Sequence, residues 1–424
     1  MNENQPIERV WTDLEAIVGR EYIWPATAND AIDGLQPGKV IAPGTAQEVA
    51  EVLQCCSAAE IAVIPRGGGS KLGLGNRPTK ADLILSTERL NRVVEHVWGD
   101  MTVIVEAGCT IEGIQNAVKQ HGQRLALDPL WPERCTVGGL LATAESGTLR
   151  IRYGAVRDLV LGVEVALSDG SLIKAGGKVV KNVAGYDLTK LVIGSLGTLG
   201  VITRAVFRLH PIPVATATYS TLLSNAPEAT KLVLALLDSH VIYTGLQLRA
   251  TRPDHIALDV RLEGIPESLQ DQFAKLGKVA AGFTFTESPA EVWDARQKLF
   301  ADPAGAVVAK CGVLPSQLGS LCEAAFRQAK SAGGTANVVA QGTGIADVRF
   351  EAADLKSFSK ILDGIRSEVW ALDGTLVVQR CPSALKESLD VWGALQDALP
   401  LMQEIKGKFD PARTLNPGRF VGAI

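Results

Sequence analysis

A short apolar run that leads into a glycine-rich loop constrains this chain more than any other feature. IAVIP at 61–65 is typical of a buried strand, and RGGGSKLGLGN follows it directly. Glycines let the backbone adopt positive φ and bring successive N–H groups close to an anion, with no side chain in the way. Arg66 and Lys71 could neutralise a diphosphate there. Taken alone, however, such a loop serves a structural turn as readily as a phosphate site.

Two common phosphate-binding motifs do not fit this chain. A dinucleotide fingerprint needs G-x-G-x-x-G; the glycine loop starts this pattern twice, and Leu72 and Pro78 break it. A Walker A loop needs G-x-x-x-x-G-K followed by serine or threonine, but Val179 follows the candidate Lys178. The glycine loop therefore needs support from elsewhere in the sequence.

Composition limits the class of protein. With 424 residues the chain is too long for one compact core, so we expect about two or three domains. The net charge of -4 gives no electrostatic reason to expect nucleic acid or an anionic membrane as the main partner. The seven cysteines form no C-x-x-C pair and the five histidines are scattered, so we expect a reduced protein with no metal centre of its own.

Hydrophobic targeting signals are not predicted. The N-terminus MNENQPIERVW is polar and acidic, unlike a signal peptide. The longest apolar stretches, such as KLVLALLDS, are far shorter than the roughly 20 residues needed to span a bilayer. We therefore expect a soluble chain that could still dock on a membrane-bound partner.

The first half of the chain is predicted to alternate strands and helices. Thr45 and Glu48 form the pattern of a capping box at the start of one helix, and Thr110 is expected to open another. LGVEVALSDGSLIKAG predicts a hairpin with its turn at Asp169–Gly170. Further strands are expected at 61–65, at 82–86 and on either side of Gly99–Asp100, and prolines at 211 and 213 indicate a linker.

The second half has a different pattern. Strand, helix, strand, strand, helix, strand is predicted for 214–287, and the same order recurs from about 306 to 380. Each run matches the β-α-β-β-α-β unit of ferredoxin-like folds, although the two runs are not obviously similar in sequence. A last helix is expected near 384–406, before KGKFDPARTLNPGRF.

Four segments together resemble a known family. They are PRGGGSKLGLGN, DPLWPERCTVGGLLATAESGTLRIRYGAVRDLVLGVEVALSDG, KVVKNVAGYDLTKLVIGSLGTLGVIT and FDPARTLNPGR. Their order and spacing resemble the FAD-linked oxidases of the vanillyl-alcohol oxidase / p-cresol methylhydroxylase superfamily, strongly over 40–213 and loosely over 214–424. KNVAGYDLTKLVIGSLGTLG and LRIRYGAVRDLVLGV are most similar to the FAD-binding subunits of glycolate oxidases.

The resemblance implies an α+β fold. It would combine a two-subdomain FAD-binding module of the p-cresol methylhydroxylase (PCMH) type with a ferredoxin-like antiparallel-sheet cap domain. The expected parts are an N-terminal helical segment at 1–35, the FAD-binding domain at 36–213 with subdomains at about 36–97 and 98–213, the cap at 214–380, and a C-terminal segment at 381–424 that returns to the FAD domain.

The resemblance also implies which residues hold the cofactor. The glycine loop would embrace the pyrophosphate, and a second loop would add a helix N-terminus, whose free N–H groups attract anions. Residues from 147 to 154 should line the flavin side, and residues 200–202 should contact the cofactor through the backbone. A tight turn between strands is the alternative for Gly197 and Gly200. The expected cofactor residues are Arg66, Gly67, Gly68, Gly69, Ser70, Lys71, Thr136, Val137, Gly138, Gly139, Gly147, Tyr153, Gly154, Gly200, Val201 and Ile202.

Covalent attachment of the flavin is not expected. Covalent relatives often carry a histidine after the glycine loop, where this chain has Ser70. Cys135 is near the second loop, but it is out of register with the cysteine that some relatives use. The resemblance therefore implies dissociable, non-covalent FAD.

The sequence assigns no catalytic residue. Oxidising a 2-hydroxy acid needs a base, a cation for the carboxylate and a flavin to take the hydride. Catalytic relatives carry an H-x-G-D-G-N-x-H-like segment on the cap sheet, and AQGTGIAD at 340–347 keeps its glycines but neither histidine nor the acid between the glycines. Arg150 or Arg152 could hold a carboxylate and Tyr186 could be an acid or base; surface arginines and a packed tyrosine are the alternatives.

Three functions follow from the resemblance. The first is an FAD-binding subunit of a glycolate oxidase/dehydrogenase complex, with a second FAD-linked catalytic subunit and an iron–sulfur subunit as partners. The second is a self-sufficient FAD-dependent 2-hydroxy acid dehydrogenase, of D-lactate or similar acids. The third is a non-catalytic FAD-binding assembly subunit. The first is preferred, and it implies a cytoplasmic location, or one peripheral to the inner membrane through partner subunits.

Overall fold

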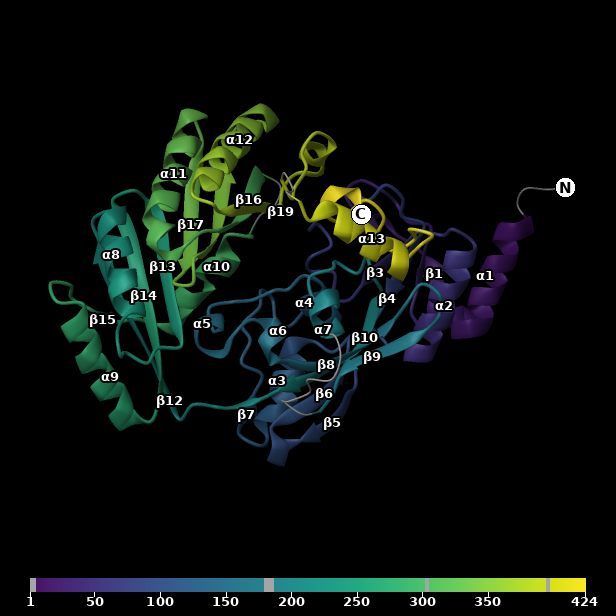
Figure 1. Cartoon of the computed structure of the whole chain (residues 1–424), viewed down its shortest axis with the longest axis horizontal. Helices are drawn as coiled ribbons and strands as arrows, with labels where there is room; N and C mark the ends of the chain where they lie inside the picture. Colours follow the sequence, from purple (N-terminus) through teal and green to yellow (C-terminus); the bar gives the residue numbers. More distant parts are fainter. Residues whose placement is uncertain (1–4, 179–186, 302–304, 394–396) are drawn as a thin grey trace. The chain divides into compact units, whose positions relative to one another are not determined.

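The chain forms two compact units, each with its own hydrophobic core (Figure 1). The computed structural model describes residues 5–178, 187–301, 305–393 and 397–424. Unit 1 comprises Met1–Ser146, Gly154–Ile212 and Ala394–Ile424, and unit 2 comprises Gly147–Tyr153 and Pro213–Gly393. The fold is α+β, as expected from the sequence.

The first sheet of unit 1 has the strand order β1-β2-β4-β3. β2 and β3 both run parallel to β4, and β1 joins β2 in antiparallel pairing. Thr45 caps helix α2 as expected, because its hydroxyl accepts the Glu48 amide at 3.1 Å; the Glu48 carboxylate reaches the Gly44 amide. The elements are α1 (Gln5–Val18), β1 (Ile23–Pro25), β2 (Lys39–Ile41), α2 (Ala46–Ala58), β3 (Val63–Arg66) and β4 (Leu83–Ser86).

The first 35 residues are less helical than expected. After α1 the chain makes short 3-10 turns and then β1, which pairs with the edge of β2. Leu14 of α1 is buried in the same core as the apolar face of α2. This segment therefore belongs to the first layer of unit 1 and is not a separate helical segment.

The second sheet of unit 1 is antiparallel, with the order β5-β6-β10-β8-β9. Its β8–β9 hairpin turns at Asp169–Gly170 as predicted, with Gly170 at φ 86°. The first subdomain ends before β5 and not at 97, because β5 pairs with β6 across a 3-10 turn. The elements are β5 (Val93–Val97), β6 (Thr102–Glu106), α3 (Ile111–Lys119), β7 (Gln123–Arg124), α4 (Val137–Ala142), α6 (Val156–Leu159), β8 (Val160–Ala166), β9 (Leu172–Gly176), α7 (Leu188–Val192), β10 (Val201–Arg208) and β11 (His210–Pro211).

Unit 2 is built on one antiparallel sheet with the order β15-β12-β14-β13-β17-β18-β16-β19. Each half has the ferredoxin-like order 4-1-3-2, and the halves join where β13 pairs with β17. The two predicted β-α-β-β-α-β runs are thus both present. The elements are β12 (Ala215–Leu223), α8 (Ala226–Leu237), β13 (Gly245–Arg252), β14 (His255–Gly264), α9 (Pro266–Val279), β15 (Thr286–Glu287), α10 (Ala295–Lys298), β16 (Ala306–Gly312), α11 (Leu318–Ser331), β17 (Thr335–Gln341), β18 (Ile345–Glu351), α12 (Leu355–Ala371) and β19 (Thr375–Arg380).

The unit boundaries differ from the sequence expectation in two places. Helix α5 (Arg150–Tyr153) belongs to unit 2, because it packs on β13. The segment after β19 also stays in unit 2, since the Val378 amide bonds the Val391 carbonyl and Val391 is buried in that core.

The expected helix near 384–406 is wrong in its position. The structure has a 3-10 turn at Ser383–Glu387 and then α13 (Leu399–Phe409), which has a proline in its first turn. Gly393 at φ 79° separates the two, in a conformation that a helix does not use. None of the helices in the described residues is both long and apolar enough to cross a membrane.

Candidate functional site

Unit 1 contains two adjoining hollows at the end of β3, of about 490 and 450 Å³. Both are lined by Arg66, Gly67 and Gly139, so they form one site. Twelve of the sixteen cofactor residues expected from the sequence line it: Arg66, Gly67, Gly68, Gly69, Ser70, Lys71, Thr136, Gly138, Gly139, Gly200, Val201 and Ile202.

The glycine loop offers uncommitted backbone donors. In the part of the chain that the structure describes, the amides of Gly68, Gly69, Ser70 and Lys71 donate to no protein acceptor. Gly69 has φ 72°, which suits a chain that turns successive N–H groups toward one side. Four consecutive free donors beside a hollow favour an anionic ligand.

Two of these glycines are needed for close packing. A Cβ on Gly67 would lie 1.9 Å from Thr136 Oγ1, and one on Gly68 would lie 1.8 Å from the Arg134 carbonyl oxygen. Real Cβ atoms never approach that closely, so the loop lies directly on the segment before α4. The absence of side chains here is a requirement of the fold.

The two cations predicted to neutralise a diphosphate each have an acidic neighbour. Arg66 forms an ion pair with Asp30, and the pKa of Asp30 is lowered by its backbone hydrogen bond from Thr27 and by Arg66. Lys71 Nζ lies 3.7 Å from the buried Glu145 carboxylate. The net positive charge at the loop is therefore smaller than its sequence suggests.

Cys135 beside this loop is a buried thiol. Lys71 Nζ lies 3.6 Å from its Sγ, and the side chain is 1% exposed. Burial raises its pKa, against the opposing effect of Lys71. The thiol is thus held in its protonated, less nucleophilic form.

The second loop corrects one expectation. Helix α4 begins after Thr136, as expected, but the backbone N–H groups of its first residues already have acceptors within the protein. Val137 donates to the Cys109 carbonyl at 2.9 Å, Gly138 donates to the Ala107 carbonyl at 2.8 Å, and Gly139 donates to Thr136 Oγ1 at 3.4 Å. This loop therefore supplies a wall of the hollow, whereas the amides of residues 68–71 in the glycine loop have no protein acceptor among the described residues.

The turn before β10 forms the opposite wall. Ser195, Leu196 and Gly197 line the hollow together with Gly200. Leu196 has φ 55° and Gly197 has φ 71°, so two consecutive residues are left-handed. A left-handed leucine is costly, and surrounding contacts must hold it.

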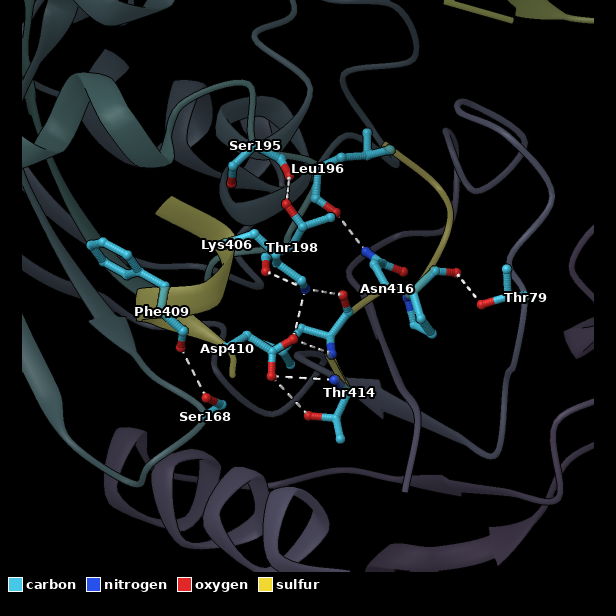
Figure 2. A network of polar contacts seen from close by, with 12 residues as sticks. Thr79, Ser168, Ser195, Leu196, Thr198, Lys406, Phe409, Asp410, Thr414 and Asn416 are labelled. Atoms are coloured by element: carbon cyan, nitrogen blue, oxygen red, sulfur yellow. Dashed lines mark hydrogen bonds and ion pairs between the residues drawn. The ribbon is translucent and has the colours of Figure 1, made fainter. Parts of the chain in front are cut away.

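Those contacts come from the C-terminal tail, which sequence reasoning did not assign to the site. Asn416 and Arg419 both line the hollow. The Asn416 side-chain amide donates to the Leu196 carbonyl, and the buried Arg419 guanidinium donates to the carbonyls of Leu72 and Leu74 (Figure 2 shows the Asn416 contact). Burial lowers the pKa of Arg419 to about 10. The segment FDPARTLNPGR was expected to return to this domain, and that expectation could have indicated Asn416 and Arg419 as residues of the site.

Four expected cofactor residues do not line the hollow. Val137 is buried in the core beneath α4. Gly147 and Tyr153 belong to unit 2, where the Tyr153 hydroxyl donates to Glu263 at 3.2 Å. Gly154, at φ 88°, makes the turn into α6.

The catalytic candidates receive little support from the structure. Arg150 is half-buried and Arg152 is exposed, both on the four-residue helix α5 of unit 2. Tyr186 lies outside the described residues. No acid or base pair emerges from this set.

The 340–347 segment forms the β17–β18 hairpin of unit 2. Gly344, at φ 92°, approaches the Val313 carbonyl so closely that a Cβ would lie 2.0 Å from that oxygen. The glycines of this segment thus serve the hairpin turn. Three buried atoms near it have no hydrogen-bond partner among the described residues: Gln341 Oε1, Thr343 Oγ1 and Asp347 Oδ1.

Two arginines on this sheet face are paired with carboxylates, whereas the side chain of the half-buried Lys310, opposite Asp347 across β16 and β18, has no ion pair or hydrogen bond among the described residues. Asp347 Oδ2 accepts from Arg296 Nε at 2.6 Å, with both side chains buried. Arg249 makes a bidentate pair with Asp259, at 2.6 and 2.8 Å. Gln247 and Gln341 face each other across β13 and β17, so these groups share one polar face of the sheet.

A segment of unit 2 lies over that polar face. Gln247 donates to the Val292 carbonyl at 2.8 Å, and Trp293 Nε1 donates to Thr218 at 3.0 Å. Arg349 donates to the Leu299 carbonyl at 2.9 Å. Residues 290–300, which include Arg296 itself, therefore bridge from β12 to β18.

Comparison with known proteins gives a consistent picture. Residues 37–176 match the FAD binding domain family. The chain is 34% identical to the glycolate oxidase subunit GlcD of Bacillus subtilis over 232 residues, which is 55% of this chain and 49% of that protein. It is 39% identical to a D-lactate dehydrogenase of Archaeoglobus fulgidus over 41% of this chain and 38% of that one. The chain thus spans half or less of these relatives.

Two further similarities extend over nearly the whole chain. An uncharacterised FAD-linked oxidoreductase of Mycobacterium tuberculosis is 28% identical over 91% of both proteins. The structure of p-cresol methylhydroxylase with substrate bound matches 99% of this chain and 97% of its own, with a TM-score of 0.79 at 16% identity. The latter likeness concerns the fold alone.

Proposed function

We propose that this chain, an FAD-binding protein of the p-cresol methylhydroxylase type, is the FAD-binding subunit of a glycolate oxidase-type complex. In this role it would serve the oxidation of glycolate or a related 2-hydroxy acid to the 2-oxo acid. Electrons would pass by way of FAD to a second FAD-linked subunit and an iron–sulfur subunit. The similarity to glycolate oxidase and D-lactate dehydrogenase sequences supports the substrate class.

One observation carries the cofactor assignment. The four uncommitted amides of residues 68–71 lie beside the hollow, with Arg66 and Lys71 next to them. A pyrophosphate needs this combination of directed donors and positive charge. We assign the diphosphate of FAD to this loop, and the walls at 136–143 and 195–202 to the rest of the cofactor.

The cofactor's chemistry and the protein's part in it are separate. Bound FAD would supply a redox centre that takes up electrons and passes them on. The chain's own residues bind and orient the cofactor: the glycine loop by its amides, the second loop and the turn before β10 by their backbone walls. The buried, protonated Cys135 thiol supports non-covalent attachment.

The paired arginines of unit 2 favour a subunit of a complex over a self-sufficient enzyme. A 2-hydroxy acid needs a cation for its carboxylate, yet Arg249 and Arg296 are each bound to an internal carboxylate. Breaking such a buried pair costs several kcal/mol, about 3–5 when one partner is removed. We therefore propose that the partner subunit binds the substrate, and that the location is cytoplasmic or peripheral to the inner membrane through the partners.

The self-sufficient dehydrogenase remains the second candidate, because one observation favours it. Asp347 Oδ1 is buried and has no partner among the described residues. A carboxylate oxygen in that state can accept a hydroxyl proton, as a general base must. Under this alternative, Asp347 would replace the missing histidines.

The visible spectrum of the isolated chain separates these functions. The purified chain, with FAD added if needed, is mixed anaerobically with glycolate and then with D-lactate. We expect flavin that stays oxidised until the partner subunits are added. Bleaching in the isolated chain, and its loss in an Asp347→Asn variant that still folds and binds FAD, would establish the second candidate. A chain that binds no FAD under any condition would refute both.

A further inference from the structure

A buried ion pair in the C-terminal tail holds together the elements around the hollow. Lys406 and Asp410 are 1% and 0% exposed, one helical turn apart at the end of α13 (Figure 2). Lys406 Nζ donates to Asp410 Oδ2 at 2.6 Å, to the Thr198 carbonyl at 2.8 Å and to the Leu415 carbonyl at 2.9 Å. An ammonium has three protons, so all of them are used.

The Asp410 carboxylate is equally well bonded. Its Oδ2 also accepts the Leu415 amide at 2.8 Å, and its Oδ1 accepts the amide and the hydroxyl of Thr414 at 3.2 and 3.1 Å. The pair therefore fixes the backbone of residues 414 and 415. Desolvation lowers the pKa of Lys406, and the Asp410 charge opposes that effect.

The fixed tail extends the first sheet beside the strand that leads into the glycine loop. The Val63 amide donates to the Thr414 carbonyl at 2.8 Å, and the Asn416 amide donates to the Val63 carbonyl at 3.0 Å. Three residues later Arg419 bonds the carbonyls of Leu72 and Leu74. A shift of the tail would therefore be felt at the glycine loop.

The same tail holds the opposite wall. Lys406 bonds the Thr198 carbonyl, and Asn416 bonds the Leu196 carbonyl two residues earlier (Figure 2). These carbonyls flank the left-handed Gly197, in a turn whose conformation needs outside support. Both walls of the hollow thus depend on one tail, and the tail depends on one ion pair.

We propose that Lys406 and Asp410 are positioning residues for the cofactor: they set FAD affinity by holding the 195–200 turn and the glycine loop in register. This inference rests on the proposed function, since it takes the hollow to be the FAD site. Neither residue lines the hollow, so both act through Leu196, Thr198 and the 414–419 backbone.

The alternative is a pair that serves stability alone, and the two readings predict different results. Replacing a buried ion pair by apolar residues of similar volume is often neutral or stabilising, but it removes the directed hydrogen bonds. A Lys406→Met/Asp410→Leu double variant should therefore stay folded while losing its hold on the Thr198 and Leu415 carbonyls. In this double variant the effect on the stability of the fold can therefore be separated from the effect on FAD affinity.

The experiment measures the FAD dissociation constant and the urea midpoint of the apoprotein for three chains. They are the parent, the double variant and Ile114→Ala, a buried core position on α3 that does not line the hollow. We expect the double variant to bind FAD roughly tenfold to a hundredfold more weakly. Ile114→Ala should lower the urea midpoint yet keep FAD affinity within about twofold where it is folded.

A shift in the absorption bands of the bound flavin in the double variant, absent in Ile114→Ala, would further support positioning. Asp410→Asn, which keeps the side-chain volume, gives a second test, with a smaller loss of affinity in the same direction. Parent-like FAD affinity in both tail variants would overturn the positioning role while leaving the FAD site intact. A parent that binds no FAD would overturn the proposed function itself, and this inference with it.

Discussion

Replacing Gly68 by alanine tests the central geometry of the site. A Cβ at this position would lie 1.8 Å from the Arg134 carbonyl oxygen, and ordinary contact begins near 3.4 Å, so the shortfall is 1.6 Å. The obstacle is backbone, which cannot rotate away as a side chain can. Gly68 must therefore move by more than an ångström, and the free amides of residues 68–71 must move with it. Overpacking of this kind costs about 1–3 kcal/mol of stability.

The effect on cofactor binding should be larger than the effect on the fold. Misplacing the loop by about an ångström should weaken FAD binding roughly a hundredfold, because the amides no longer converge on one diphosphate. Titration of the apoprotein with FAD, followed by flavin fluorescence, measures this directly. The urea midpoint of the same samples separates lost affinity from lost folding.

The same loop supplies the matched control. A Cβ on Gly73 would meet nothing within 4 Å, so Gly73→Ala should leave FAD affinity unchanged. An equal loss of FAD affinity in Gly68→Ala and Gly73→Ala would mean that the loop needs the flexibility of glycine, and not close packing against residue 134. Unchanged FAD affinity in Gly68→Ala would refute the assignment of the diphosphate to this loop.

Three further predictions concern charged and titratable groups. Burial lowers the pKa of His210 from 6.5 to about 4, so the unfolded chain binds the proton more tightly between these values. The free energy of unfolding should then fall as the pH drops from 6.5 to 4, and urea titrations of His210→Asn should show a flatter dependence. Lys406→Met should destabilise by about 3–5 kcal/mol in urea because it leaves Asp410 buried without its cation, and adding Asp410→Leu should restore part of that loss, since the amides of Thr414 and Leu415 then lack their acceptor. Asp347→Asn should cost a similar ~3–5 kcal/mol by calorimetry, since Arg296 loses its buried partner; a change under 1 kcal/mol would show that this pair is weak.

Local signals in the sequence predicted the elements well. Thr45 and Thr110 cap their helices because a side-chain oxygen and a nearby amide are all that a cap requires. The turn at Asp169–Gly170 follows from two adjacent residues in the same way. The order of strands and helices in unit 2 came from periodicity, which is also a local property. Such features need no knowledge of the rest of the chain.

Long-range partners could not be predicted from these signals. Arg66 forms its ion pair with Asp30, and Arg419 bonds the Leu72 carbonyl from 347 positions away. Nothing in the local pattern around either arginine indicates its partner. The sequence therefore identified the charges at the glycine loop but overestimated how much of that charge is left for a ligand.

The expectation of free amides in the second loop, at residues 136–139, differs from the structure for a related reason. A helix start after Thr136 was expected, and it is present, but the use of its amides depends on Ala107 and Cys109. Those carbonyls reach α4 only because the segment after β6 folds beside it. Helix starts attract anions only when their N–H groups are free, and that condition is tertiary.

The two units differ in which of their polar groups have no partner within the protein, and this difference is the basis of the function that we propose. In unit 1, four consecutive amides beside the hollow have no protein acceptor among the described residues, so a cofactor can bind without displacing anything. On the polar face of unit 2, a substrate carboxylate would have to compete with Asp259 or Asp347 for an arginine already bound at 2.6 Å. The interaction energy that a substrate carboxylate gains from the arginine is lost by the internal carboxylate that it displaces. Among the described residues, unit 1 thus leaves donors free beside its hollow while Arg249 and Arg296 of unit 2 are already paired, and this difference is the reason we propose a subunit that works with a catalytic partner.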